Sequence, residues 1–240
     1  YEGGDKLFVP IENIEVLSKY GSDDEAVSLD KLGGAGWQSR KARVKKDLLR
    51  IAEHLMKIAA ARELKKGEAL SVDNEVYNRF SATFPYAETD DQNKAIADVV
   101  EDMASGRPMD RLVCGDVGFG KTEVALRAAY VAAMDGAQVA LIAPTTLLVR
   151  QHYMNFVERF KNTGLKIAQL SRFVTPRAAK ATREGMAKGE VNIVIGTHAL
   201  LAKDIKFDHL GLMIIDEEQR FGVKQKERLK ELRENVHILT

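Results

Sequence analysis

The sequence has one cysteine, no excess of either charge and no long apolar run. The lone cysteine, Cys114, excludes an internal disulfide framework and is typical of a reducing compartment. No apolar stretch approaches the roughly 18 residues that a membrane span needs, so we expect no membrane partner and a cytoplasmic protein. Because 36 Lys and Arg balance 35 Asp and Glu, a generally basic nucleic-acid binder is not indicated, and any such site must be a local patch.

The ends of the sequence lack the signals of a complete chain. It starts at Tyr1 without a methionine, a signal peptide or a targeting segment, and it stops at Thr240 directly after an apolar run. We therefore expect a fragment of a longer protein. At about 150 residues per domain, its 240 residues allow one large domain, or an ordinary domain with a smaller module.

The N-terminal segment, residues 1–36, is predicted to be a small β module followed by a loop. Leu7, Val9 and Ile11 alternate with residues of the opposite face, which indicates one or two short strands within residues 1–20. These strands are too few to form a stable sheet alone. Glycine and acidic residues in Gly21–Gly36 indicate a loop.

A long amphipathic helix, the connector, is predicted over Gln38–Lys66, within a segment that we assign to residues 37–67. Apolar residues recur there every three or four positions, at Val44, Leu48, Ile51, Leu55 and Ile58. We expect this stripe to pack against a neighbouring domain. The basic cluster in residues 40–46 is either a solvated helix face or a contact with nucleic acid or an acidic partner.

Residues 68–240 alternate between helix and strand patterns. Strands separated by helices of this length predict an α/β fold, with a parallel sheet covered by helices on both faces. Helices are predicted over Asp90–Ala104, from the glycine-rich turn to Asp135, over Thr146–Lys161, from Pro176 (capped by Thr175) to Gly189, and over Lys224–Arg233. Strands are predicted over Arg111–Cys114, Gln138–Ala143, Leu165–Leu170, Val191–Ile195 and Leu212–Ile215, with a last apolar run at His237–Thr240.

A phosphate-binding loop is predicted at Gly115–Thr122, which matches the pattern G-x-x-x-x-G-K-[ST] between a strand and a helix. Glycines let backbone N–H groups turn toward phosphate oxygens, and the helix N-terminus adds partial positive charge. We expect Lys121 to neutralise the β- and γ-phosphates and the Thr122 hydroxyl to ligate Mg²⁺. The alternative is a glycine-rich turn that matches by chance.

Two acids end the predicted strand Leu212–Ile215, about 95 residues after the loop. The carboxyl ends of parallel strands form the ligand crevice of such sheets. Asp216 is therefore expected to hold Mg²⁺ directly or through water, and Glu217 to orient and deprotonate an attacking water. Acids after a strand are also often no more than a helix cap.

The base of the nucleotide is predicted to be adenine. The guanine signature N-K-x-D is missing, since Asn93 and Lys94 are followed by Ala95 and Ile96. The amide of Gln92 can both donate and accept, which suits the hydrogen-bonding edge of adenine. On spacing alone, Gln92 is also an ordinary first-turn helix residue.

From about Phe80, the chain resembles the first RecA-like lobe of superfamily 2 helicase-type motors. The motifs that carry the resemblance are Thr89–Gln92 (Q motif), Gly115–Thr122 (I), Pro144–Leu148 (Ia), Ile195–His198 (Ib/Ic) and Asp216–Gln219 (II). The segments 110–125 and 216–223 resemble the family of bacterial transcription-repair coupling factors. The segments 6–10 and 31–37 resemble the end of that family's Tudor-like RNA polymerase-interacting domain and the stretch after it.

The resemblance implies roles for individual residues. It implies that adenine is read by Gln92 and that the nucleotide is bound by Gly115, Gly118, Phe119, Gly120, Lys121, Thr122 and Gln219. It implies DNA-backbone contacts by Thr145, Arg172, Thr197 and His198. The residues alone leave an alternative open for each site: Thr145 as a helix cap, and Thr197–His198 as a turn at the end of a strand. Related motors often carry His where this chain has Gln219, whose amide cannot titrate.

The function that the resemblance implies is ATP-dependent translocation on double-stranded DNA. In the family, this activity displaces a stalled RNA polymerase, contacted through its β subunit, and recruits an excision-repair protein through parts outside these residues. The second lobe and its arginine fingers are missing here, so we expect the 240 residues alone to hydrolyse ATP very slowly. The alternatives are a RecG-type fork-remodelling translocase and a non-catalytic docking module switched by nucleotide.

Overall fold

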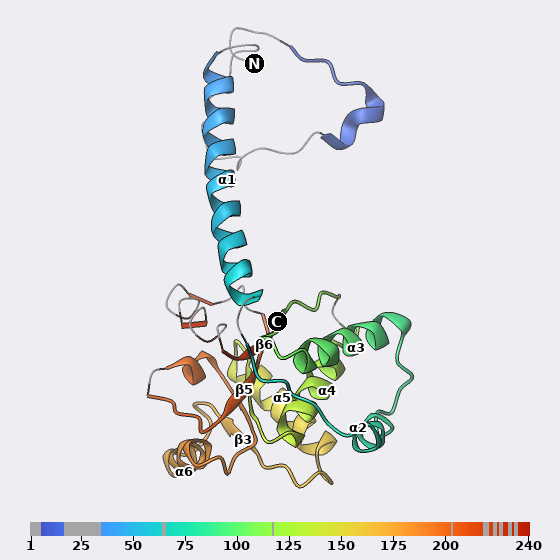
Figure 1. Cartoon of the computed structure of the whole chain (residues 1–240), viewed down its shortest axis with the longest axis vertical. Helices are drawn as coiled ribbons and strands as arrows, with labels where there is room; N and C mark the ends of the chain where they lie inside the picture. The colour runs from blue at the N-terminus through green and yellow to red at the C-terminus, as the bar shows by residue number, and fades with distance from the viewer. Residues whose placement is uncertain are drawn as a thin grey trace. The chain divides into compact units, whose positions relative to one another are not determined.

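The computed structural model describes residues 6–16, 35–63, 66–116, 118–202, 204–217, 221–222, 225, 228–229, 232 and 235–240. The chain divides into two units, Tyr1–Ala61 and Arg62–Thr240 (Figure 1). In the described part of the chain, no helix is both long and apolar enough to cross a membrane.

The N-terminal unit differs from the sequence-based prediction. Residues 6–10 have no regular secondary structure, and Ile11–Val16 forms a 3-10 helix, η1. The predicted strands are therefore wrong for residues 6–16. A strand needs a hydrogen-bonded neighbour, whereas Leu7, Phe8 and Ile11 are 58%, 87% and 79% exposed. The remaining residues of the predicted strands, and most of the predicted loop, lie outside the described residues.

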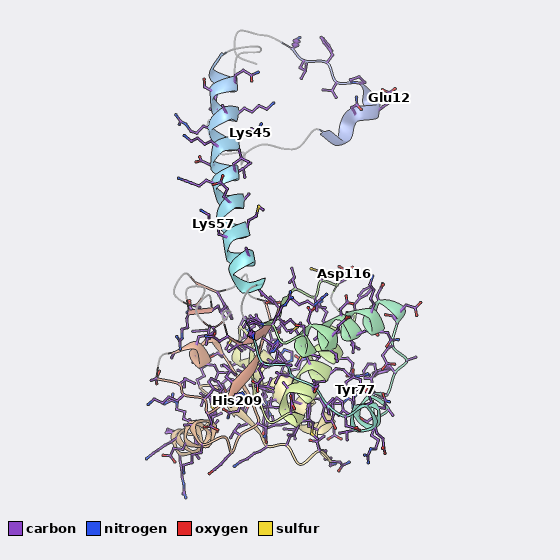
Figure 2. The ribbon with its side chains drawn as sticks, in the orientation of Figure 1. Glu12, Lys45, Lys57, Tyr77, Asp116 and His209 are labelled. Carbon is purple, nitrogen blue, oxygen red and sulfur yellow. The ribbon has the colours of Figure 1, made fainter. Side chains whose placement is uncertain are left out.

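The predicted connector helix is confirmed as α1, Ala35–Glu63, which begins three residues earlier than Gln38. Val44, Leu48 and Ile51 of its apolar stripe are all more than half exposed. The side chains of Leu55 and Ile58 are not described, so packing of the stripe against a neighbouring domain stays a prediction. Lys45 and Lys57 project outward from the helix (Figure 2).

The second unit is built on a six-stranded sheet in which all paired strands are parallel. Its order is β1-β6-β5-β2-β4-β3. The strands are β1 (Asp110–Arg111), β2 (Gln138–Ile142), β3 (Ile167–Leu170), β4 (Ile193–Gly196), β5 (Leu210–Ile215) and β6 (His237–Leu239). This sheet confirms the predicted α/β class.

Helices cover both faces of the sheet, as predicted. Along β2, Val139 and Leu141 pack into one core with α3 and α4, while Ala140 and Ile142 pack into a second core with α6. This alternation follows from the two-residue period of a strand. The helices are α2 (Asn74–Ser81), α3 (Asp90–Ala104), α4 (Lys121–Met134), α5 (Thr146–Arg159) and α6 (Pro176–Ala187), with the 3-10 helix η2 (His198–Leu201).

Side chains cap the N-termini of three helices, and the cap predicted at Thr175 is confirmed. Thr89 and Gln92 form a reciprocal capping box at α3, and Thr145 and Thr175 accept backbone N–H bonds at α5 and α6. The sequence analysis missed α2, although Asp73 caps it through the N–H groups of its first turn.

Two predicted elements differ at the edges of this unit. The strand expected at Arg111–Cys114 is only Asp110–Arg111, because β1 is an edge strand that pairs with β6 alone. Val113 still donates to the Thr240 carbonyl at 2.8 Å, just after β6, and residues 114–116 then lead to the glycine-rich loop. The helix expected at Lys224–Arg233 is helical at its described residues (225, 228, 229 and 232), and its other residues lie outside the description.

Candidate active site

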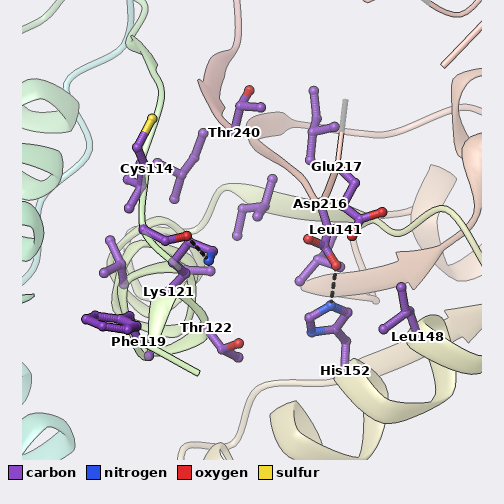
Figure 3. A pocket seen from close by; sticks show the side chains of 18 of the residues that line it. Cys114, Phe119, Lys121, Thr122, Leu141, Leu148, His152, Asp216, Glu217 and Thr240 are labelled. Atoms are coloured by element: carbon purple, nitrogen blue, oxygen red, sulfur yellow. Dashed lines mark hydrogen bonds and ion pairs between the residues drawn. The ribbon is translucent and has the colours of Figure 1, made fainter. Parts of the chain in front are cut away.

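A cavity of about 850 Å³ opens at the carboxyl ends of the central strands. Figure 3 shows Lys121 and Thr122 on one side of it, opposite Asp216 and His152. Its lining includes Gly115, Lys121, Thr122, His152, Asp216 and Glu217. The structure therefore brings the two predicted motifs, which are far apart in sequence, to a single site.

The glycine-rich loop leads directly into α4. Gly118 and Gly120 have φ angles of 88° and 75°, a left-handed conformation that glycine adopts without steric cost. Gly120 occupies the cap position of α4, where no side chain bonds the first N–H groups. These N–H groups and the helix dipole make the start of α4 suited to an anion.

Lys121 folds back into this loop. Its Nζ donates to the carbonyl oxygens of Gly115 at 2.5 Å and Asp116 at 2.8 Å. The ammonium therefore lies inside the curve of the loop, close to the N–H groups at the start of α4. A phosphate bound there would meet a full positive charge as well as backbone donors.

The acids that follow β5 are held by the strand. The Asp216 N–H donates to the Ile142 carbonyl on β2 at 2.9 Å, which continues the pairing of β5 with β2. Glu217 has a φ of 58°, a costly backbone conformation for a residue with a side chain. Such strain is concentrated at functional sites, and here it occurs in the residue predicted to activate water.

The donors at this site fit Mg²⁺ carried by a phosphate ligand. Thr122 and Asp216 offer a hydroxyl and a carboxylate, both hard oxygen donors. Among the described residues, no group of three or more His, Cys, Asp or Glu could hold a metal ion. Mg²⁺ is usually bound by one or two carboxylates together with substrate phosphates, so these few donors suit a nucleotide-bound ion.

Gln92 connects the start of α3 to the phosphate loop. Its Oε1 accepts from the Thr89 N–H at 2.9 Å, and its Nε2 donates to the Phe119 carbonyl at 2.8 Å. A side chain at Gly120 would collide with the Gln92 amide, so this approach requires glycine. Contact with adenine stays a prediction, and the amide keeps a second hydrogen and a second lone pair for it.

The profile of the DEAD/DEAH box helicase family matches residues 89–240. The chain belongs to this family. The match implies a helicase-type ATPase domain. Over its whole length, the chain is 53% identical to the transcription-repair-coupling factor of Rickettsia bellii and 51% identical to that of Bacillus subtilis. It spans 22% and 20% of those proteins, about a fifth of their length.

Solved structures share the fold of this unit. The structure of RecG bound to a three-way DNA junction superposes with a TM-score of 0.71 at 34% identity, over 85% of this chain and 28% of that one. A hypothetical ATP-dependent RNA helicase from Sulfolobus tokodaii has a TM-score of 0.52 at 20% identity, over 70% of this chain and 50% of that one, and shows the shared fold.

The four residues predicted to contact DNA do not line the cavity of this helicase domain. Thr145, Arg172 and Thr197–His198 follow the carboxyl ends of β2, β3 and β4, so they lie along one edge of the sheet. Thr145 caps α5 and Thr197 caps η2, while the Arg172 guanidinium is 5.5 Å from the Phe173 ring centroid. Gln219 lies outside the described residues.

His152 is a site residue that the sequence analysis missed. On α5, its Nε2 is 3.0 Å from Oδ2 of Asp216 (Figure 3). The contact arises because β2 and β5 are neighbours, so the helix after β2 passes the end of β5. The sequence order of the strands gave no signal of that adjacency.

A largely buried ionic cluster lies on α4, the helix that starts with Lys121. Glu123 on α4 accepts from Arg127 at 2.6 Å and from Arg159 of α5 at 2.9 Å, and Arg127 also pairs with Glu88. Burial lowers the pKa of Arg127, but its hydrogen bonds to Glu123 and other acceptors prevail and raise it. Backbone hydrogen bonding and Arg127 lower the pKa of Glu88. Both shifts favour the charged forms of Arg127 and Glu88, and the cluster joins α4, α5 and the segment before α3.

Proposed function

We propose that this chain is the first motor lobe of an ATP-driven, double-stranded DNA translocase that acts in transcription-coupled repair. The observation that carries the proposal is the cavity that contains Lys121, Asp216 and Glu217 together. The family match supports an ATPase, and the transcription-repair-coupling factors that align with the whole chain support the biological setting.

The chemistry that we propose is in-line hydrolysis of ATP. Loop N–H groups and Lys121 hold the phosphates, Thr122 and Asp216 hold Mg²⁺, and Gln92 reads adenine. Bound Mg²⁺ supplies neutralisation of the phosphate charge. Glu217 takes a proton from water as the water oxygen bonds to the γ-phosphorus. The bond from that phosphorus to its bridging oxygen breaks, and ADP and phosphate leave.

The DNA contacts that we propose are to the phosphate backbone. The residues proposed for these contacts follow β2, β3 and β4, which are contiguous in the sheet: they are Thr145, Arg172, Thr197 and His198. The RecG structure is that of a DNA complex. Backbone contacts predict binding that is independent of sequence and weakened by salt. ATP would close this lobe and a second one on DNA, and hydrolysis would reopen them, giving one step.

In the cell, we propose that this stepping displaces a stalled RNA polymerase in the bacterial cytoplasm. Residues 1–36 would be the end of a Tudor-like module that contacts the polymerase β subunit, residues 37–67 the connector, and residues 68–240 the motor lobe. An excision-repair damage-recognition protein would be recruited by parts of the full-length protein outside this chain. The names of the aligned relatives support this assignment.

The test uses the full-length gene product. RNA polymerase is stalled on a duplex by nucleotide starvation, and its release is followed after adding the protein and ATP, with Glu217→Gln as the control. We expect release by the wild type and none by the variant. DNA-stimulated ATP turnover without release would favour a fork-remodelling translocase of the RecG type. Release by both proteins would mean that docking alone is enough to release the polymerase, and it would refute the proposal that ATP hydrolysis drives the release.

A further inference from the structure

His152 has one hydrogen-bonding partner among the described residues, the carboxylate of Asp216. Its Nε2 is 3.0 Å from Asp216 Oδ2, and its side chain is 15% exposed. Its other ring nitrogen, Nδ1, is buried without a hydrogen-bond partner. His152 is therefore a largely buried residue that lines the cavity, and its only described side-chain hydrogen bond is to Asp216, the residue predicted to hold Mg²⁺.

The direction of this hydrogen bond follows from its two partners. A carboxylate accepts, so the proton must be on Nε2, and the tautomer with hydrogen on Nδ1 would set a lone pair against the anion. The bond restrains one carboxylate oxygen of Asp216. The Asp216 backbone is already held by the Ile142 carbonyl at 2.9 Å. The acid is therefore oriented from both its main chain and its side chain.

The helix that carries His152 also reaches two other functional parts. α5 begins after Thr145, a proposed DNA contact, which lies seven residues, or about two turns, before His152. At its other end, Arg159 bonds Glu123 of α4, the helix that starts with Lys121. A shift of α5 would therefore move His152 and change the orientation of the Asp216 carboxylate.

We propose that His152 is a positioning residue that orients Asp216 toward Mg²⁺ and connects this acid to α5. The proposal rests on the proposed function, because it takes Asp216 as the metal-binding acid. A hydrogen bond to a ligating carboxylate keeps it in its binding rotamer and lowers the entropy lost when the ion binds. Loss of such outer contacts typically weakens metal affinity by about 10- to 100-fold.

The test measures Mg²⁺ dependence without hydrolysis, on the full-length gene product. Binding of a fluorescent, non-hydrolysable ATP analogue is titrated with Mg²⁺, and with EDTA to give the metal-free affinity. We expect His152→Leu to raise the half-saturating Mg²⁺ concentration about tenfold and to leave metal-free affinity unchanged. His152→Gln should recover much of the loss, because its amide also donates. Met154→Ala is the matched control, an exposed change on the same helix.

The link to α5 is tested by adding duplex DNA to the same titration. We expect DNA to lower the half-saturating Mg²⁺ concentration for the wild type and for Met154→Ala, and this shift to be lost in His152→Leu. A DNA shift retained by His152→Leu would overturn the link.

The remaining outcomes separate this proposal from the one on which it rests. An unchanged Mg²⁺ requirement in His152→Leu would overturn the positioning role, and so would equal losses of binding with and without metal in both His152 variants. If Asp216→Asn also kept the wild-type Mg²⁺ requirement, the proposed metal site itself would be wrong.

Discussion

At the scale of single residues, the site combines one fixed cation with two differently held acids. Lys121 lies inside the loop, bonded to two carbonyls that a phosphate would replace. Asp216 is oriented by backbone and histidine, whereas Glu217 has a strained backbone. The fixed direction of the Asp216 carboxylate suits the metal-binding role that we propose for this acid.

Replacing Glu217 separates the proposed base from nucleotide binding. We expect Glu217→Gln to lower kcat for ATP by about 10²- to 10⁴-fold, the usual contribution of a general base, with little change in ATP-analogue affinity. The measurement is steady-state turnover of the full-length gene product together with analogue binding. Glu158→Gln, an exposed carboxylate on α5, is the control. Similar turnover by both variants would contradict the assignment.

Cys114 offers a direct report of nucleotide occupancy. It is exposed, it lines the cavity beside the phosphate loop, and it is the only cysteine of the chain. We expect Mg²⁺ and an ATP analogue to slow its alkylation by a maleimide severalfold, because the ligand covers the thiol. Alkylation is followed by mass spectrometry on the 240-residue chain. In Lys121→Ala, protection should need far more analogue.

His237 is expected to make stability depend on pH. It is 2% exposed, its Nδ1 accepts from the Met109 N–H at 3.1 Å, and its Nε2 donates to the Glu68 carbonyl at 2.9 Å, so it is neutral. Burial lowers the pKa of His237 from 6.5. The unfolded chain therefore binds a proton first, and the free energy of unfolding falls as pH drops below about 6.5, by at most about 1.4 kcal/mol per unit.

Urea unfolding of the 240-residue chain at pH 7.5 and 5.5 measures this effect. His237→Asn is less stable at both pH values, but it should lose the part of the pH dependence that His237 causes. If the variant showed the same pH dependence of the free energy of unfolding as the wild type, groups other than His237 would be its cause.

At the scale of elements, the helix boundaries were the most predictable feature. The starts at Asp90, Thr146 and Pro176 were predicted correctly, and the cap predicted at Thr175 is confirmed, because a capping residue acts locally. Strands were less predictable, because pairing decides whether an alternating segment becomes one. Leu7–Ile11 lacks such a partner in the described residues and is not a strand, and the edge strand β1 has two residues where four were expected.

Among the contacts between elements, we expect substitution in the buried ionic cluster to lower the free energy of unfolding the most. Glu123 is 4% exposed and pairs with Arg127 and Arg159. Glu123→Ala leaves both guanidinium groups without this partner, and we expect a loss of about 3–5 kcal/mol in the free energy of unfolding. Urea titration measures it. Glu75→Ala, which breaks an exposed pair with Arg79 on α2, should change stability by less than about 0.5 kcal/mol.

At the scale of the whole molecule, the cavity is short of positive charge for phosphoryl transfer. Among the described residues that line it, Lys121 is the only Lys or Arg. An arginine supplied from another lobe or protein is worth about 10³- to 10⁵-fold in rate. We therefore expect the 240-residue chain to bind Mg·ATP weakly and to hydrolyse it very slowly, as measured by phosphate release. Rapid turnover that disappears in Lys121→Ala would contradict this expectation.

The sequence by itself determined the fold class, the phosphate loop and the acid pair, because these depend on short patterns of residue type within continuous segments. Tertiary structure alone decided which segments meet. It placed β5 beside β2 and so brought His152 to Asp216, joined Gln92 to the phosphate loop at Phe119, and brought Arg159 of α5 to Glu123 of α4. Each of these contacts depends on strand order and helix packing, which are set by the free energy of burying the whole core and not by any local pattern.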